Sequence, residues 1–169
     1  MREIETLWRG RKGEARVVEV DIGAGGPRRE LLVVHPGSVV LVPVLDDGRV
    51  VLIRNRRFAV GGAVLELPAG TLEPPEDALA CAHRELLEET GYRAATMERL
   101  GGFWLAPSFS TEWMEVFAAR GLRFEGQRLD VGEEISVETL DSGRVRDAIG
   151  TGALCDAKSL AALMLLERA

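Results

Sequence analysis

The segment Gly70–Tyr92, GTLEPPEDALACAHRELLEETGY, carries the strongest pattern in this sequence. Over residues 77–90, small or apolar residues recur with the period of an α-helix. They form one stripe: Leu79, Ala82, Leu86 and Thr90. Gly91 comes next, and glycine often ends a helix because it adopts left-handed backbone angles without strain. The segment therefore predicts a loop from Gly70 followed by one helix.

Three glutamates of this helix, Glu85, Glu88 and Glu89, share a face that is separate from the apolar stripe. Such close like charges cost roughly 0.2–0.5 kcal/mol per pair, and the helix dipole disfavours anions in the last turns. A bound divalent cation reverses that cost, because Mg²⁺ and Mn²⁺ prefer oxygen ligands. A solvated acidic surface is the alternative interpretation, since runs of charge usually lie on the surface.

Composition limits the partners and the kinds of metal site. The chain has 169 residues, 46% of them hydrophobic, as expected for a soluble globular domain. Its 27 acidic and 21 basic residues give a formal net charge of −6, which argues against binding to nucleic acid or to an anionic membrane. Two distant cysteines (Cys81 and Cys155) and two histidines (His35 and His83) exclude a metal site built from either residue type. A metal would need oxygen ligands.

No segment predicts a membrane span or a secretory leader. The longest apolar runs, Val39–Leu45 and Leu160–Leu166, are far shorter than the roughly 20 residues that cross a bilayer. The N-terminal sequence MREIETLWRG lacks the apolar core of a signal peptide. We therefore expect a cytoplasmic protein.

Strands and two further helices are expected around the central helix. The expected strands cover residues 15–21, 29–35, 38–45, 49–54, 64–67, 97–104, 113–119 and 134–140. The continuous apolar run of residues 38–45 indicates a strand that is buried on both faces. Helices are expected over residues 141–149 and 156–168, with Asp141 and Asp156 as candidate N-caps. This order predicts an α/β sandwich with a mixed sheet over residues 36–169, preceded by a small N-terminal antiparallel β unit over residues 1–35.

The spacing of the central segment decides between a metal site and a solvated surface. Five residues separate Gly70 from Glu76, and seven separate Glu76 from Arg84. The whole segment fits the Nudix box, G-x5-E-x7-R-E-U-x-E-E-x-G-U with U apolar, and a chance fit has a probability on the order of 10⁻⁹ per window. The sequence therefore resembles the Nudix hydrolases, which have an α/β/α sandwich fold and cleave a diphosphate linked to another moiety by attack of water on phosphorus.

This resemblance implies roles for the residues of the box. In Nudix hydrolases the box glutamates hold a divalent metal, implied to be Mg²⁺ or Mn²⁺, often with the carbonyl before the box glycine. The implied ligands here are Ala69, Glu85, Glu88 and Glu89, and Glu85 and Glu89 are implied to be catalytic. The other box residues are implied to be structural, with a salt bridge between arginine and glutamate that supports the helix: Gly70, Glu76, Arg84 and Gly91.

The resemblance extends over roughly residues 34–140 and is greatest to the ADP-ribose and ADP-sugar pyrophosphatases. An arginine-bearing segment, residues 54–57, precedes LELPAG at residues 65–70, as in that subfamily. Downstream, APSFSTE at residues 106–112 resembles its Pro-Gly-Phe-Ser/Thr-Asp-Glu loop, although Ser108 replaces the glycine and Thr111 the aspartate. The implied reaction is hydrolysis of ADP-ribose or another ADP-sugar to AMP and a sugar phosphate.

Six residues are candidates for contact with this substrate: Arg57, Trp8, Trp104, Pro107, Phe109 and Glu112. Arg57 is expected to bind phosphate or ribose, although a plain surface arginine is the alternative. The three aromatic residues are candidates to stack on a base, but each also fits a core or interface position. The resembling enzymes build their two sites across a dimer interface with the N-terminal β unit, so a homodimer is implied, with Trp8 near the site.

The acidic loop at residues 130–134 is the expected source of the group that activates water. The resembling enzymes carry a glutamate just before a late strand, and both Glu133 and Glu134 fit that place, with Glu133 preferred. Glu112 is a second candidate, and ordinary loop charge is the alternative. The choice needs geometry that a sequence does not supply.

Two other functions compete with this hypothesis. One is a pyrophosphohydrolase of (oxidised) nucleoside triphosphates, which the N-terminal β unit and Pro107 disfavour. The other is a non-catalytic Nudix-like sensor of ADP-ribose, which the intact box disfavours. A Glu89→Gln variant separates an enzyme from a sensor, because only an enzyme has a rate to lose.

Overall fold

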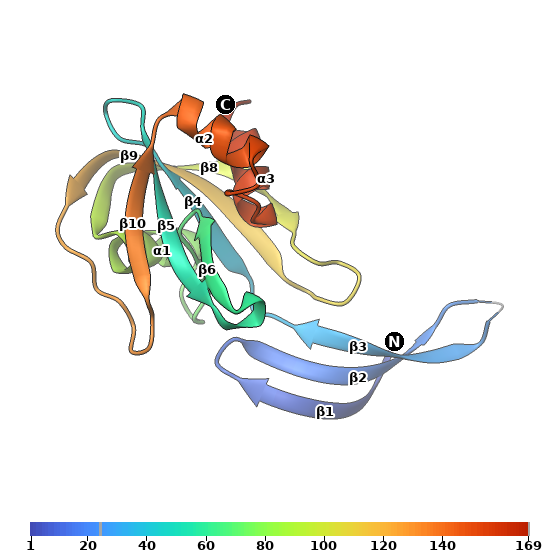
Figure 1. The fold of residues 1–169 in the computed structure, drawn as a ribbon. Helices are drawn as coiled ribbons and strands as arrows, with labels where there is room; N and C mark the ends of the chain where they lie inside the picture. The colour runs from blue at the N-terminus through green and yellow to red at the C-terminus, as the bar shows by residue number, and fades with distance from the viewer. Residues whose placement is uncertain (24, 169) are drawn as a thin grey trace.

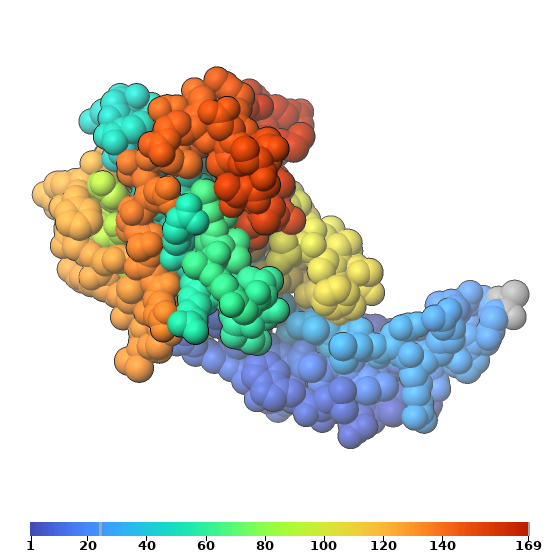
Figure 2. All heavy atoms as spheres, in the orientation of Figure 1, coloured from blue at the N-terminus to red at the C-terminus, as the bar shows by residue number. Residues whose placement is uncertain are grey.

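The computed structural model describes residues 1–23 and 25–168. Within them the strands form three sheets, which Figure 1 shows as an N-terminal arm and a helix-covered body. The arm is the sheet β1-β2-β3, with β1 at Arg2–Gly10, β2 at Gly13–Asp21 and β3 at Pro27–Val34. Both strand pairs of the arm are antiparallel. The space-filling view shows that the arm projects away from the body (Figure 2).

Two sheets build the body. The first has the order β7-β4-β9-β8 and is mixed, because β4 runs parallel to β9 while the other pairs are antiparallel. Its strands are β4 (Ser38–Pro43), β7 (Ala69–Thr71), β8 (Tyr92–Trp104) and β9 (Trp113–Phe124). The second sheet, β10-β5-β6, is antiparallel and contains β5 (Val50–Arg57), β6 (Gly62–Glu66) and β10 (Ile135–Leu140). A single 3₁₀ turn, Phe58–Val60, connects β5 to β6.

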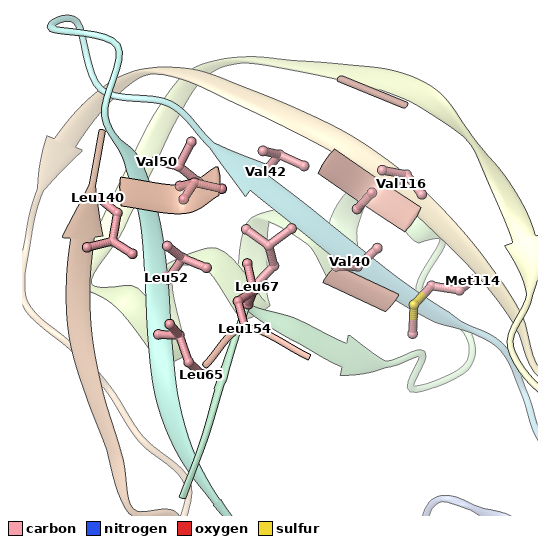
Figure 3. Packing of buried hydrophobic residues seen from close by; sticks show 12 residues of the cluster. Val40, Val42, Val50, Leu52, Leu65, Leu67, Met114, Val116, Leu140 and Leu154 are labelled. Carbon is pink, nitrogen blue, oxygen red and sulfur yellow. The ribbon is translucent and has the colours of Figure 1, made fainter. Parts of the chain in front are cut away.

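Strand β4 lies in the middle of the hydrophobic core. Val39 and Leu41 pack with residues of helix α1 (Ala78–Glu85), whereas Val40 and Val42 join a cluster on the opposite face. That second cluster spans both body sheets, as Figure 3 shows, and includes residues of α2 (Ser142–Gly150) and α3 (Ala157–Leu166). Helices therefore cover both faces, which confirms the predicted α/β/α sandwich and the doubly buried strand.

The box helix differs from the prediction in two respects. It is α-helical only over α1, and the next residues, Leu86–Thr90, form a wider π-helical turn before Gly91 ends the helix in the left-handed conformation. The predicted apolar stripe was wrong at Leu79, whose side chain is 46% exposed. Cys81 instead packs into the core beside Ala82 because the helix presents that face to β4. π-turns inside α-helices often occur at functional sites.

The N-terminal arm has three strands instead of the two predicted. Strand β1 was missed because it is exposed along its whole length, so its sequence lacks the alternation that one buried face imposes. The arm joins the body through β3, where the backbone N–H of Val33 donates to the carbonyl of Phe109 (2.7 Å) and Thr111 donates to Val33 (3.0 Å). At the β1–β2 turn, Arg11 pairs with Asp130 of the body (3.0 Å).

The remaining elements lie close to their predicted positions. Asp141 and Asp156 accept hydrogen bonds from backbone amides in the first turns of α2 and α3, which confirms both as N-caps. β8 and β9 are longer than predicted, and β7 was missed because it has only three residues. The apolar periodicity of the last helix predicts a stripe that includes Leu160, Leu163 and Met164, and this prediction was wrong at Met164, whose side chain is exposed. Among the described residues, no helix is long and apolar enough to cross a membrane.

Candidate active site

The box helix forms one wall of a cleft of about 580 Å³. Other walls come from the ends of β5 and β6, from β7, and from the segments around Glu112, Glu133 and Lys158. The β1–β2 turn contributes Arg11 and Lys12, so the N-terminal arm reaches the rim of the cleft. A volume of this size suits a small-molecule ligand.

Glu89 is the most buried of the three box glutamates, with 3% of its surface exposed. Its carboxylate accepts a hydrogen bond from the backbone N–H of Ala69 at 2.8 Å. Burial raises the pKa of Glu89 to about 8; the Ala69 hydrogen bond opposes that shift, and the negative charge of Glu85 adds to it. The protein thus holds a carboxylate here at an energetic cost that a nearby cation would relieve.

Glu85 is held against the backbone of the box loop. A Cβ atom on Gly70 would lie 1.8 Å from Cδ of Glu85, so only glycine leaves room for this carboxylate. Burial raises the pKa of Glu85, Arg84 lowers it, and the charges of Glu88 and Glu133 raise it further. The effect of Glu133 on Glu85 indicates that the acidic loop faces the box helix.

Arg84 connects the box glutamates to the loop that precedes them. Its guanidinium donates to Glu76 (2.5 Å), to Glu85 (2.6 Å) and to Glu88 (3.1 Å). It also donates to the carbonyl of Thr71 at 3.2 Å. The arginine and Glu76 therefore form the salt bridge that the resemblance implies, and the guanidinium fixes the path of residues 71–76 against the helix.

The donor set of this wall suits a divalent metal. Glu85, Glu88 and Glu89 all line the cleft together with Ala69, and carboxylate and carbonyl oxygens are the ligands that Mg²⁺ prefers. In the described part of the chain, no three His, Cys, Asp or Glu side chains are already grouped as a cation site. Arg84 holds two of the carboxylates, while Glu89 turns to the Ala69 amide. These carboxylates would therefore bind a metal only after their side chains rotate.

A buried ion-pair network lies next to this wall. Arg57, at the end of β5, donates to Glu66 at 2.6 Å, and Glu66 also accepts from Lys158 at 2.7 Å. Lys158 in turn donates to Asp156 at 2.8 Å. Arg57, Glu66, Lys158 and Asp156 all line the cleft. Arg57 is thus not a plain surface arginine, because a buried carboxylate orients it.

The three candidates for activating water lie in different places. Glu133 lines the cleft and accepts a hydrogen bond from the backbone N–H of Asp130 (3.0 Å). Glu134 is exposed on the outer side of the loop, where it pairs with Arg56 (3.1 Å). Glu112 also lines the cleft, but it accepts a hydrogen bond from the hydroxyl of Ser38 (2.8 Å).

The part of the chain that forms most of this cleft matches a known domain family. Residues 34–157 match the model of the NUDIX domain, a span that contains the box, both body sheets and the start of α3. The chain belongs to the Nudix family. It is thus a Nudix hydrolase, and the three box glutamates line the cleft.

Similar proteins agree with this assignment to the Nudix hydrolases. An ADP-ribose pyrophosphatase of Bacillus subtilis is 30% identical over 166 residues, which cover 96% of this chain and 89% of that protein. A methanol dehydrogenase activator of Bacillus methanolicus is 30% identical over 165 residues, with 96% and 89% covered. The crystal structure of an ADP compounds hydrolase superposes with a TM-score of 0.83 at 24% identity, covers 99% of this chain and 94% of that one, and shows the shared fold.

The aromatic candidates lie outside this Nudix cleft. Within the described residues, the cleft lining does not include Trp8, Trp104, Pro107 or Phe109. Trp104 packs edge-to-face on Trp113 with ring centroids 5.0 Å apart, and Trp8 is half exposed on β1 of the arm. A single chain therefore brings together the box glutamates, Arg57 and two of the three candidate bases, Glu112 and Glu133, but not the expected stacking residues.

Sequence reasoning missed Glu66 and Lys158, although both carried a signal. Glu66 is a lone charged residue in the apolar sequence of β6, and buried charges without partners are costly. The chain has 19 arginines and two lysines, and both lysines, Lys12 and Lys158, line the cleft. The rarity of lysine could have singled out these two positions.

Proposed function

We propose that this Nudix hydrolase acts on a nucleoside diphosphate linked to another moiety, with ADP-ribose or another ADP-sugar as the substrate. The products would be AMP and a sugar phosphate. One observation carries the proposal: the buried Glu85 and Glu89 share a cleft of about 580 Å³ with Arg57, so carboxylates suited to a metal face a cation suited to phosphate. The name of the Bacillus subtilis relative, ADP-ribose pyrophosphatase, supports the choice of substrate.

The implied cofactor is Mg²⁺ or Mn²⁺, held by Glu85, Glu88, Glu89 and the carbonyl of Ala69. When bound, such a cation offsets the charge of the diphosphate and lowers the pKa of the attacking water. The chain's own contribution is to keep these oxygen donors in a desolvated wall. Burial raises the pKa of Glu85 and Glu89, and a bound cation would oppose that shift because it favours the charged carboxylates.

The other residues of the cleft bind the substrate and accept the proton of the attacking water. Arg57 presents a guanidinium that Glu66 orients, and such a planar donor suits the diphosphate oxygens. Glu133 is our choice as the general base, because it lines the cleft and its negative charge raises the pKa of Glu85. Glu112 is held by Ser38 and suits a role in positioning substrate or metal.

We also infer a homodimer in which the arm of one copy packs against the other. Strand β1 leaves Ile4, Leu7 and Trp8 exposed, and apolar side chains gathered on one strand favour a protein partner. A partner copy would give Trp8 a route to a base that its own cleft does not offer. Light scattering coupled to gel filtration tests this: wild type should elute as a dimer, and Leu7→Asp as a monomer. A monomeric wild type would contradict it. The cytoplasmic location stays a prediction.

The substrate is tested by comparing hydrolysis of ADP-ribose, GDP-mannose, NADH, FAD and oxidised deoxynucleoside triphosphates in Mg²⁺. We expect the highest kcat/KM for ADP-ribose or another ADP-sugar, with AMP as one product. A preference for nucleoside triphosphates would overturn the substrate assignment and favour a triphosphate pyrophosphohydrolase. The products identify the bond that is broken, so the two activities are distinguished even where both substrates react.

A Glu89→Gln variant separates catalysis from ligand sensing. We expect it to fold and to lose roughly 10²–10⁴-fold in kcat, because it removes a buried anionic ligand from the metal site. Glu98→Gln is the matched control, since Glu98 is exposed on β8 away from the cleft. A wild type that binds ADP-ribose but never turns it over would support the sensor function. Adding the protein to a dehydrogenase is a separate assay, suggested only by the name of the Bacillus methanolicus relative.

A further inference from the structure

Lys158 is buried in a place where lysine is rarely found. Only 8% of its surface is exposed, and its ammonium group lies between two carboxylates, Glu66 (2.7 Å) and Asp156 (2.8 Å). Asp156 is also fixed, because it accepts hydrogen bonds from the backbone and the hydroxyl of Ser159 at the start of α3. Asp156 is the N-cap of α3, so the carboxylate that pairs with Lys158 is itself held in place.

Glu66 is shared between Lys158 and the arginine of the cleft. Its surface is 1% exposed, and its carboxylate binds both cations: Oε1 accepts from Arg57 (2.6 Å), and Oε2 accepts from Lys158 (2.7 Å) and more weakly from Arg57 (3.4 Å). The Arg57 side chain is 38% exposed, so its guanidinium reaches from the buried carboxylate into the cleft. With Asp156, the network holds two positive and two negative charges and is neutral as a whole.

We propose that Lys158 is a positioning residue for substrate binding, which neutralises Glu66 so that the positive charge of Arg57 remains available to the diphosphate. This inference rests on the proposed function. Without Lys158, Glu66 would neutralise Arg57 alone, and the group Arg57–Glu66–Asp156 would carry a net negative charge. In a desolvated wall, that charge repels an anionic substrate more strongly than it would in water.

The same charge would also act on the metal-binding wall. Glu66 lies close enough to raise the pKa of Glu89, while Arg57 lowers it. Removal of Lys158 would therefore leave one carboxylate of the network uncompensated in the cleft that also contains the box glutamates and Arg57. Lys158 and Glu66 take no direct part in the chemical step. The removal of Lys158 should therefore weaken substrate binding more than it lowers kcat.

The first variant is Lys158→Met, which keeps the length of the side chain and removes its charge. We expect a roughly tenfold rise in KM for ADP-ribose, with kcat changed by less than about threefold. Isothermal titration of ADP-ribose into metal-free protein should show a matching rise in Kd. Arg54→Met is the matched control. Arg54 lies on the same strand as Arg57 and pairs with Glu138 at 2.8 Å, and within the described residues it is absent from the cleft lining.

The double variant Glu66→Gln/Lys158→Met distinguishes charge compensation from a purely structural role. Glutamine keeps an oxygen that accepts from Arg57, and the network is neutral again. We expect the double variant to recover most of the affinity that Lys158→Met loses. A structural role predicts the opposite, because two broken contacts should be at least as damaging as one. The double variant also contains no uncompensated buried carboxylate from Glu66. If Lys158→Met fails to fold, the proposal is tested against wild type: the double variant should bind ADP-ribose about as tightly as wild type, and clearly weaker binding would contradict the proposal.

Two results would overturn the proposal: wild-type affinity in Lys158→Met, or a double variant that binds no better than the single one. Failure of the proposed function is recognised separately, in the wild type. A wild-type protein that neither binds nor cleaves ADP-sugars removes the proposed function and this inference with it. A wild type that cleaves ADP-ribose, combined with either variant result above, removes the role of Lys158 alone.

Discussion

Gly70 and Glu85 occupy adjoining space so tightly that a Cβ atom on the glycine would lie 1.8 Å from the carboxylate carbon. The glycine on β7 and the glutamate on the box helix are fifteen positions apart in the sequence but in direct contact in the fold. The contact explains in physical terms why a glycine belongs at the start of the box. It leaves the volume that Glu85 needs to lie in the wall of the cleft.

We therefore expect Gly70→Ala to displace Glu85 and to lower kcat/KM by roughly 10²-fold, because a shift of about 1 Å in a catalytic group has that effect. The increase in melting temperature on adding Mg²⁺ should shrink as well. Gly150→Ala is the matched control, since a Cβ there meets nothing within 4 Å. Wild-type kinetics in Gly70→Ala would show that Glu85 does not need this position.

The buried Glu89 predicts how the stability of the metal-free protein depends on pH. Burial raises the pKa of Glu89 from its ordinary value of 4.5 to about 8, so between these values the folded state binds more protons than the unfolded state. Stability should therefore fall as the pH rises from about 4.5 to 8. Thermal unfolding in EDTA at several pH values measures this, and the melting temperature should be lower at pH 8 than at pH 6.

Two variants isolate the contribution of Glu89 to that slope. Glu89→Gln cannot ionise, so its melting temperature should fall less between pH 6 and pH 8 than that of wild type. Glu98→Gln makes the same chemical change at an exposed position and should keep the wild-type slope. Equal slopes in wild type and Glu89→Gln would mean that Glu89 ionises as readily in the fold as in the unfolded chain.

The parts of the fold that burial dictates could be predicted from the sequence. The apolar run of residues 38–45 could only be a doubly buried strand, and β4 is that strand. Strand β1 is the opposite case, because its residues are exposed and no pattern of burial marks them. Its place in the sheet is determined by pairing with β2, an interaction between backbones that side-chain patterns do not record.

The candidate site shows the same division. The spacing of Glu85, Glu88 and Glu89 on one helix follows from the sequence, because residues of a single helix keep fixed relations. Glu66 and Lys158 are 92 positions apart, and only the packing of α3 beside β6 brings them together. The arm is a third case: the reach of Arg11 to Asp130 depends on the angle between arm and body, which no local pattern sets.

Arg84 should contribute far more to stability than a surface arginine does. Arg84→Met leaves Glu76 and Glu85 without their cation in a partly buried site, and we expect a loss of about 2–3 kcal/mol in the free energy of unfolding. Arg93→Met removes an exposed pair with Glu125 and should cost less than about 1 kcal/mol. Urea unfolding of both variants measures the difference. Similar losses would mean that solvent screens the Arg84 contacts as fully as those of Arg93.

We expect Glu133 to accept the proton of the attacking water. Glu133 lies in the cleft and Glu134 outside it, although they are neighbours in the sequence. Glu133→Gln should lower kcat by roughly 10²–10⁴-fold, the usual contribution of a general base, while Glu134→Gln should lose only a surface contact with Arg56.

Glu112→Gln completes this series, because Glu112 is the other candidate for activating water that lines the cleft. Its carboxylate already accepts a hydrogen bond from Ser38, so we expect a larger change in KM than in kcat. Steady-state kinetics of the three variants, with circular dichroism to confirm folding, separates the roles. If Glu112→Gln lost the rate and Glu133→Gln kept it, the base would be Glu112, and Glu133 would act only through its charge on Glu85.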